Sequence, residues 1–99
     1  MRRLLPFLLI VAVACAEAPA QDATGADVFT QICARCHGDD LGGGIGPALG
    51  SGSPVPDLPE DYLTRVITRG KGAMPAFGST LSTDQIERVV AYLRQQEEP

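Results

Sequence analysis

The chain has 99 residues, with eight Lys or Arg against twelve Asp or Glu, and its formal net charge is −4. This length suits one domain, and the acidic balance argues against nucleic acid as a partner. The chain has three Phe, two Tyr and no Trp but eleven Gly and eight Pro, so it has little material for a hydrophobic core. So small a domain is expected to need a covalent cross-link or a metal to stay folded.

The first twenty residues have the layout of a secretory signal peptide. Two arginines give a positive start, residues 4–14 form an apolar run, and Ala-Pro-Ala at 18–20 matches the small-x-small cleavage preference. The apolar run is short for a membrane span, which needs ~20 apolar residues. We therefore expect residues 1–20 to be removed as a signal peptide and residues 21–99 to form one domain, exported to the periplasm or its equivalent.

Two alternatives for the leader stay open. Ala-Cys-Ala at 14–16 also fits a cleavage site. Residues 12–15 resemble a bacterial lipoprotein signal, in which Cys15 would carry lipid and anchor the protein to a membrane. The match is loose, because that signal usually has a larger aliphatic residue where this chain has Ala12.

The part that follows the leader has few chemically versatile side chains. From residue 21 onward, six positive groups face eleven acidic ones, which gives a net charge of −5. Its only histidine is His37, its only methionine is Met74, and its only cysteines are Cys33 and Cys36. Any chemistry of this domain is expected to use these four residues.

The first predicted helix covers residues 22–33. Thr24 is a suitable N-cap, and Asp27 favours the positive end of the helix dipole. Apolar residues around Phe29 recur at helical spacing and predict a buried face. Gly25, at an early position, permits another backbone to come close.

Cys33-Ala34-Arg35-Cys36-His37 reads C-x-x-C-H, the pattern of haem attachment. The two-residue gap places both thiols on one side of a helical turn, where they can add to neighbouring vinyl groups, and His37 follows to bind the iron. A thioredoxin-type dithiol would need a βαβ context, and a zinc site would need two more ligands. The haem interpretation is favoured, and an apolar macrocycle would also supply the missing core.

Residues 38–52 are predicted to form a loop because they are rich in glycine. The paired aspartates at 39 and 40 indicate a solvated turn rather than a calcium site. Pro47 offers only its carbonyl, which can fix a metal-bound imidazole and make it a better donor. Leu49 is expected to pack on the haem face.

A second helix is predicted over residues 58–69. Asp57 or Leu58 is expected to cap it, Pro59 is tolerated in its first turn, and Gly70 is a natural stop. Met74 follows in a loop, directly before a proline. A methionine in such a loop is poorly placed as core filler and well placed as an axial iron ligand.

The last predicted helix covers residues 82–96. Ser82 and Gln85 match a capping box, and Leu81 with Ile86 match a hydrophobic staple. Apolar residues then recur at helical spacing and predict a buried stripe.

Together these motifs resemble a class I cytochrome c of the small bacterial mono-haem type. The resemblance covers essentially all of residues 21–99, and it implies an all-α cytochrome c fold wrapped around one covalent haem c. It implies that the first and last helices cross near Gly25, Phe29 and Tyr92. The implied cofactor-binding residues are Cys33 and Cys36 as thioethers, His37 and Met74 as axial ligands, and Pro47 and Leu49 beside them.

The function expected from this ligand set is one-electron transfer between redox protein partners, with no small-molecule substrate and no catalytic residue. Arg35, Arg69 and Lys71 lie close in sequence to the ligands and either guide partner docking or merely solubilise the protein. The first alternative is a non-catalytic cytochrome subunit of a dehydrogenase or oxidase. The second is a haem sensor or enzyme whose iron opens when Met74 leaves.

Overall fold

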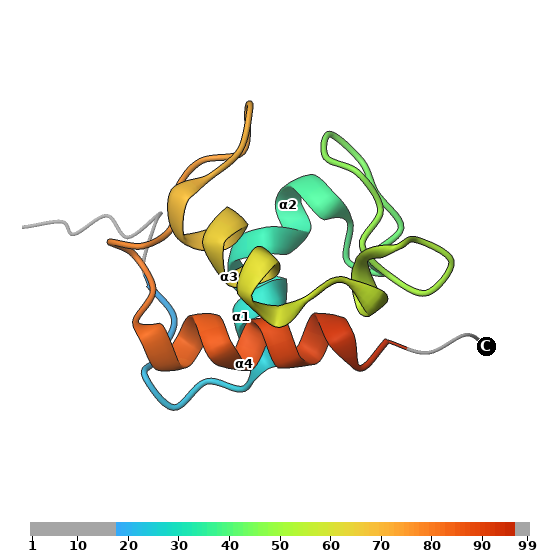
Figure 1. Ribbon diagram of the computed structural model, residues 1–99. Helices are drawn as coiled ribbons and strands as arrows, with labels where there is room; N and C mark the ends of the chain where they lie inside the picture. Colours follow the sequence, from blue (N-terminus) through green and yellow to red (C-terminus); the bar gives the residue numbers. More distant parts are fainter. Residues whose placement is uncertain (1–17, 97–99) are drawn as a thin grey trace, which may run out of the picture.

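The computed structural model describes residues 18–96 and shows a helical fold (Figure 1). Its main helices are α1 (Gly25–Val28), α2 (Ala34–His37), α3 (Glu60–Arg69) and α4 (Thr83–Arg94). In this part of the chain the only β-pairing is one isolated bridge between Lys71 and Met74. The prediction of an all-α fold is confirmed, while most of the leader, including Cys15, lies outside the described residues.

The first helical stretch is longer than predicted. It begins at Gly25, where the Thr24 hydroxyl accepts a hydrogen bond from the Asp27 N–H at 3.0 Å. A π-helical turn over Phe29–Cys33 joins α1 to α2, and the helix ends at Gly38, whose φ of 85° only glycine adopts readily. The predicted N-cap is confirmed and the predicted bounds of 22–33 are wrong, because no helix-breaking residue stands between Cys33 and Gly38.

Helix α3 begins two residues later than predicted. Asp57 is the last residue of a preceding 3-10 turn (Val55–Asp57) and Leu58 is the C-cap of that turn, so the prediction that one of them caps the helix is wrong. Pro59 is the N-cap, and its carbonyl accepts hydrogen bonds from the first turn. Gly70 ends the helix with a φ of 79°, as predicted.

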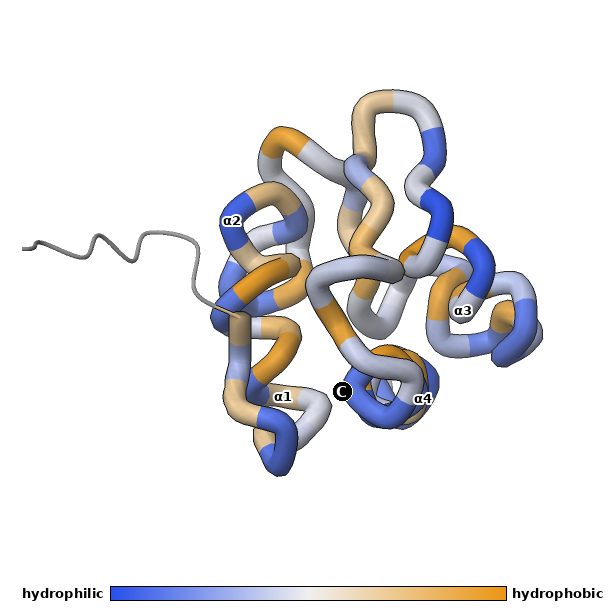
Figure 2. The backbone as a smooth tube through the Cα atoms, turned by 90° about the vertical axis from the view of Figure 1, so that its left-hand side faces the viewer, coloured by the Kyte–Doolittle hydropathy of each residue, from blue (hydrophilic) through white to orange (hydrophobic). Residues whose placement is uncertain are grey.

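Helix α4 organises the packing of the other elements. Its predicted capping box is present, with Ser82 and Gln85 bonded reciprocally. It contacts α1, α3 and the 3-10 turn, and Figure 2, which looks nearly along its axis, shows hydrophobic and hydrophilic residues on different sides. Its buried side supplies Ile86, Val89, Val90 and Leu93 to the core.

The crossing of α1 and α4 depends on Gly25. A Cβ at this position would overlap the Arg88 carbonyl oxygen and lie 2.9 Å from the Tyr92 Cβ. One turn further on, the rings of Phe29 and Tyr92 lie 5.7 Å apart between centroids, with Phe29 only 1% exposed. The predicted crossing near these three residues is therefore confirmed.

Candidate haem-binding site

The two thiols of the C-x-x-C-H motif lie on the C-terminal part of the first helical stretch. Both cysteines are free and half-buried, Cys33 at the end of the π-helical turn and Cys36 in α2. Burial, with a smaller contribution from Cys36, raises the pKa of Cys33 to about 11. The Cys33 thiol is therefore protonated at neutral pH, and its proximity to Cys36 agrees with two sulfurs on one side of the turn.

The π-helical turn lies directly before these cysteines. Its wider geometry is seen where the Ala34 N–H donates to the Phe29 carbonyl, five residues back. Such turns occur frequently at functional sites. Nothing in the C-x-x-C-H spacing predicts the turn, and only the structure reveals it.

The orientation of His37 is set by a single hydrogen bond. Its Nδ1 lies 2.7 Å from the Pro47 carbonyl oxygen, and the side chain is 9% exposed. Because a carbonyl oxygen only accepts, the hydrogen must be on Nδ1, and Nε2 is left with its lone pair. This arrangement orients Nε2 as a metal ligand and strengthens it as a donor.

The loop after α2 wraps tightly around the imidazole. Gly46 donates to the Cys36 carbonyl at 2.7 Å, and Gly43 donates to the His37 carbonyl at 2.8 Å. A Cβ on Gly46 would lie 2.9 Å from the His37 Cε1, so this position requires glycine. Pro47 thus reaches the ring because Gly46 allows the backbone to pass beside it.

The rest of this loop is built by turn residues. The Asp40 carboxylate accepts the Gly42 N–H at 2.8 Å, which agrees with the predicted turn. Leu41 adopts a φ of 63° although it is not glycine, and it is buried, so packing supports the strained conformation. The Leu49 N–H donates to the Leu41 carbonyl, and the Leu49 side chain is half-buried at the edge of the core.

Met74 lies in a separate loop that returns to α3. Lys71 and Met74 exchange two backbone hydrogen bonds, at 3.1 and 2.9 Å, which forms a tight turn. The Phe77 N–H then donates to the Ile67 carbonyl, so both ends of the loop rest on α3. In Figure 1 this loop and the loop after α2 rise on opposite sides of α2.

The chemistry of the donor set fits a covalent haem. The structure brings Cys33, Cys36, His37 and Pro47 together, and it places Met74 on another loop. Met74 and Leu49 belong to a set of hydrophobic residues that are only partly buried against the core, and these are Ile32, Cys33, Leu49, Val55, Leu58, Tyr62, Met74, Phe77 and Tyr92. An apolar macrocycle would cover such half-buried side chains.

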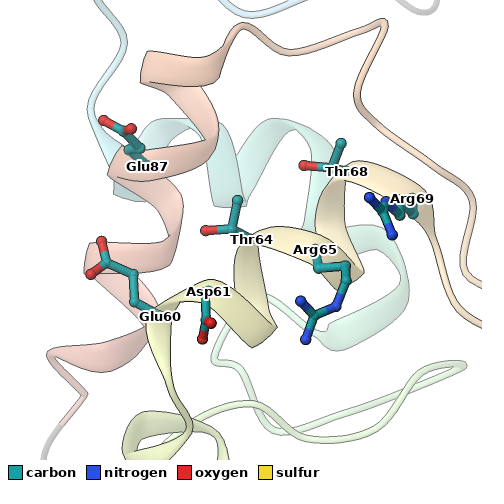
Figure 3. Close-up of a pocket in the computed structure, with 7 residues that line it drawn as sticks. All are labelled: Glu60, Asp61, Thr64, Arg65, Thr68, Arg69 and Glu87. Carbon is teal, nitrogen blue, oxygen red and sulfur yellow. The ribbon is translucent and has the colours of Figure 1, made fainter.

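A surface hollow between α3 and α4 has a different character (Figure 3). Acidic and basic side chains and two threonines line it, namely Glu60, Asp61, Thr64, Arg65, Thr68, Arg69 and Glu87. It contains none of the predicted haem-binding residues. The hollow is therefore distinct from the site around His37.

Comparison with known proteins identifies the family. Residues 20–93 match the family model described as cytochrome C oxidase, cbb3-type, subunit III. The chain belongs to the cytochrome c family. Its cofactor is a covalently attached haem c, and its function is electron transfer.

Individual relatives of this small cytochrome agree with that assignment. It is 39% identical to cytochrome c6 of Rippkaea orientalis (strain PCC 8801 / RF-1), over 99% of this chain and 96% of that protein. It is 36% identical to the cytochrome c subunit of 4-cresol dehydrogenase from Pseudomonas putida, over 90% of this chain and 74% of that protein. The structure of cytochrome c6C from Synechococcus sp. PCC 7002 matches with a TM-score of 0.60 at 32% identity, over 72% of this chain and 90% of that one.

Proposed function

We propose that this cytochrome is a freely diffusing one-electron carrier outside the cytoplasm, with Cys33 and Cys36 holding the haem and with His37 and Met74 as axial ligands. The hydrogen bond from His37 to the Pro47 carbonyl is the observation that carries this proposal, because it leaves Nε2 oriented as a donor. The haem supplies a single ferric/ferrous electron change.

The residues of this chain have separate tasks in electron transfer. The Pro47 backbone carbonyl holds the His37 ring in one orientation, and this neutral group would not change its charge with the redox state of a bound haem. Met74 supplies a thioether from a loop anchored on α3, and a thioether favours the ferrous state and a higher potential. If His37 and Met74 both hold the iron, no position would be left for a substrate, and no catalytic residue would be needed.

Positive side chains near the site would assist docking. Arg35 and Lys71 are exposed. Each makes one long hydrogen bond: Arg35 donates to the Gln31 carbonyl at 3.5 Å, and Lys71 donates to the Tyr62 hydroxyl at 3.3 Å. Arg69 lines the hollow between α3 and α4 instead. Arg35 and Lys71 are therefore the two charges best placed to attract an acidic redox partner.

A permanent cytochrome subunit of a dehydrogenase is the second candidate. The similarity to the 4-cresol dehydrogenase subunit favours it. Within residues 18–96, however, Ile45 is the one large hydrophobic residue that is strongly exposed, at 89%. A single exposed apolar residue is ordinary on a monomer, whereas a permanent interface needs a contiguous patch. None of the helices described is long and apolar enough to cross a membrane.

The experiment that tests the proposal is a potentiometric titration of the purified haem-loaded protein, followed by visible spectroscopy, with carbon monoxide added to the reduced form. A low-spin spectrum, a clearly positive potential and no response to carbon monoxide are expected. A high-spin spectrum or ready carbon monoxide binding would overturn Met74 ligation. Recovery from its native host in a fixed complex with a dehydrogenase would favour the subunit instead.

A further inference from the structure

The segment ahead of α1 packs against α4 as part of the fold. Pro19 is buried, and Ala23 is only 8% exposed. The partner of this segment on α4 is Gln85, whose side chain is 0% exposed. Residues 19 and 20 belong to the stretch that was predicted to leave with the signal peptide, so the burial of Pro19 and the contacts of both residues with α4 bear on where the mature chain begins.

The carboxamide of Gln85 is fully hydrogen-bonded only when these residues are present. Its Nε2 donates to the Pro19 carbonyl at 3.1 Å and to the Ala20 carbonyl at 3.0 Å, which uses both of its hydrogens. Its Oε1 accepts the Ser82 N–H at 2.7 Å. A buried polar group that loses its partners is costly, so Gln85 requires both carbonyls.

Arg88 holds the same segment one turn further along α4. Its Nη1 donates to the Gln21 carbonyl at 3.0 Å and to the Ala23 carbonyl at 2.9 Å. A cut after Ala20 would remove the Pro19 and Ala20 carbonyls from Gln85. It would also place a new positive amino group on Gln21, beside the guanidinium that binds that residue.

We propose that export processing cuts the chain between Ala16 and Glu17, and that Pro19 and Ala20 remain in the mature protein as a clamp on α4. Ala-Cys-Ala at 14–16 supplies the small-x-small pattern for this cut. Water adds across the Ala16–Glu17 peptide bond, which leaves a carboxylate on Ala16 and an amino group on Glu17. The released leader carries Cys15 away, so Cys33 and Cys36 are the only thiols of the mature chain.

The site of the cut is tested by expressing the full chain with its own leader in a bacterium that attaches haem c. The haem-loaded protein is recovered from the periplasm, and its first residue is determined by intact mass and N-terminal peptide mapping. A chain that begins at Glu17 is expected. A chain that begins at Gln21, or one that begins at a lipid-modified Cys15, would overturn the proposed cut.

The clamp itself is tested by comparing two haem-loaded forms, made behind a leader with a fixed cleavage site, that begin at Glu17 and at Gln21. The shorter form is expected to unfold several degrees lower, since losing one such interaction shifts the Tm of a domain this size by roughly 4–8 °C. In a Gln85→Leu background the difference should shrink by at least half, whereas Gln95→Leu, at an exposed position, should leave it unchanged. Equal melting of the two forms with Gln85 intact would refute the clamp.

Discussion

The two sides of the haem site are built differently. On one side His37 is almost buried, its ring is bonded to the Pro47 carbonyl, and Gly46 lies against it. On the other side Met74 is half-buried in a turn formed by backbone hydrogen bonds with Lys71. The histidine is thus fixed through its own side chain, while the methionine is positioned only through its loop. We infer that the Met74 side opens first under stress.

Substituting each of the two proposed ligands, His37 and Met74, should have the largest effect and directly tests whether the two sides of the site differ. His37→Ala should reduce the yield of haem-loaded, folded protein at least tenfold, because the site loses a proposed iron ligand and the buried side chain that hydrogen-bonds the Pro47 carbonyl. Met74→Ala should keep the haem attached but open the iron to carbon monoxide. Both are measured by haem content and by visible spectra with and without carbon monoxide. As a control, Phe77→Leu on the same loop should give neither result.

A change beside His37 tests how closely the loop holds it. Gly46→Ala would place a Cβ 2.9 Å from the ring, and overpacking of this kind costs about 1–3 kcal/mol. The free energy of unfolding of the haem-loaded protein, measured in guanidinium chloride, should fall by that amount. Gly42→Ala meets only the exposed Asp40 side chain and should cost clearly less. Equal losses in both variants would contradict a special fit at Gly46.

Gly70→Ala tests the Met74 side alone. This glycine has a φ of 79°, and a Cβ there would lie 2.6 Å from the Met74 carbonyl oxygen. Left-handed backbone costs other residues roughly 1–2 kcal/mol, so the turn that carries the sulfur should shift. The expected result is faster carbon monoxide binding to the reduced protein with haem content unchanged. Gly72→Ala has the same kind of strain in open space and should have a smaller effect.

Charge changes should have the smallest effect and leave both proposed ligands, His37 and Met74, intact. Arg35→Gln and Lys71→Gln should slow electron transfer to an acidic partner by about 2–5-fold at low salt, because steering charges act mainly on the association rate. Stopped-flow rates should converge with those of the unmodified protein at high ionic strength. Arg65→Gln, on α3, is the control. If it slows electron transfer as much as Arg35→Gln and Lys71→Gln do, Arg35 and Lys71 have no specific role in docking.

Local chemical patterns allowed much of this site to be predicted. The C-x-x-C-H motif, the Pro47 carbonyl and the Ser82–Gln85 capping box act over short stretches, so spacing alone indicates their partners. The contact of Pro47 with His37 is confirmed by the structure. The roles toward the haem stay predictions for all six residues, Cys33, Cys36, His37, Pro47, Leu49 and Met74.

Features that depend on tertiary packing were missed. In the π-helical turn the backbone hydrogen bond joins residues five apart instead of four. No residue composition predicts this change. Pro59 caps α3 because Asp57 is already used by a 3-10 turn. The hydrogen bonds from Gln85 to the Pro19 and Ala20 carbonyls could not be predicted, because these partners lie far from Gln85 in sequence and inside a stretch that resembles a leader.

The close crossing of α1 and α4 also sets the order in which this protein can fold. These two helices come from opposite ends of the described chain, and Gly25 meets α4 at the Arg88 carbonyl. Because closing a long loop costs entropy before its contacts repay it, the core cannot close until α4 has emerged. We infer that a chain in which α4 has not yet packed on α1 stays open, and that Cys33 and Cys36 remain accessible until this crossing forms.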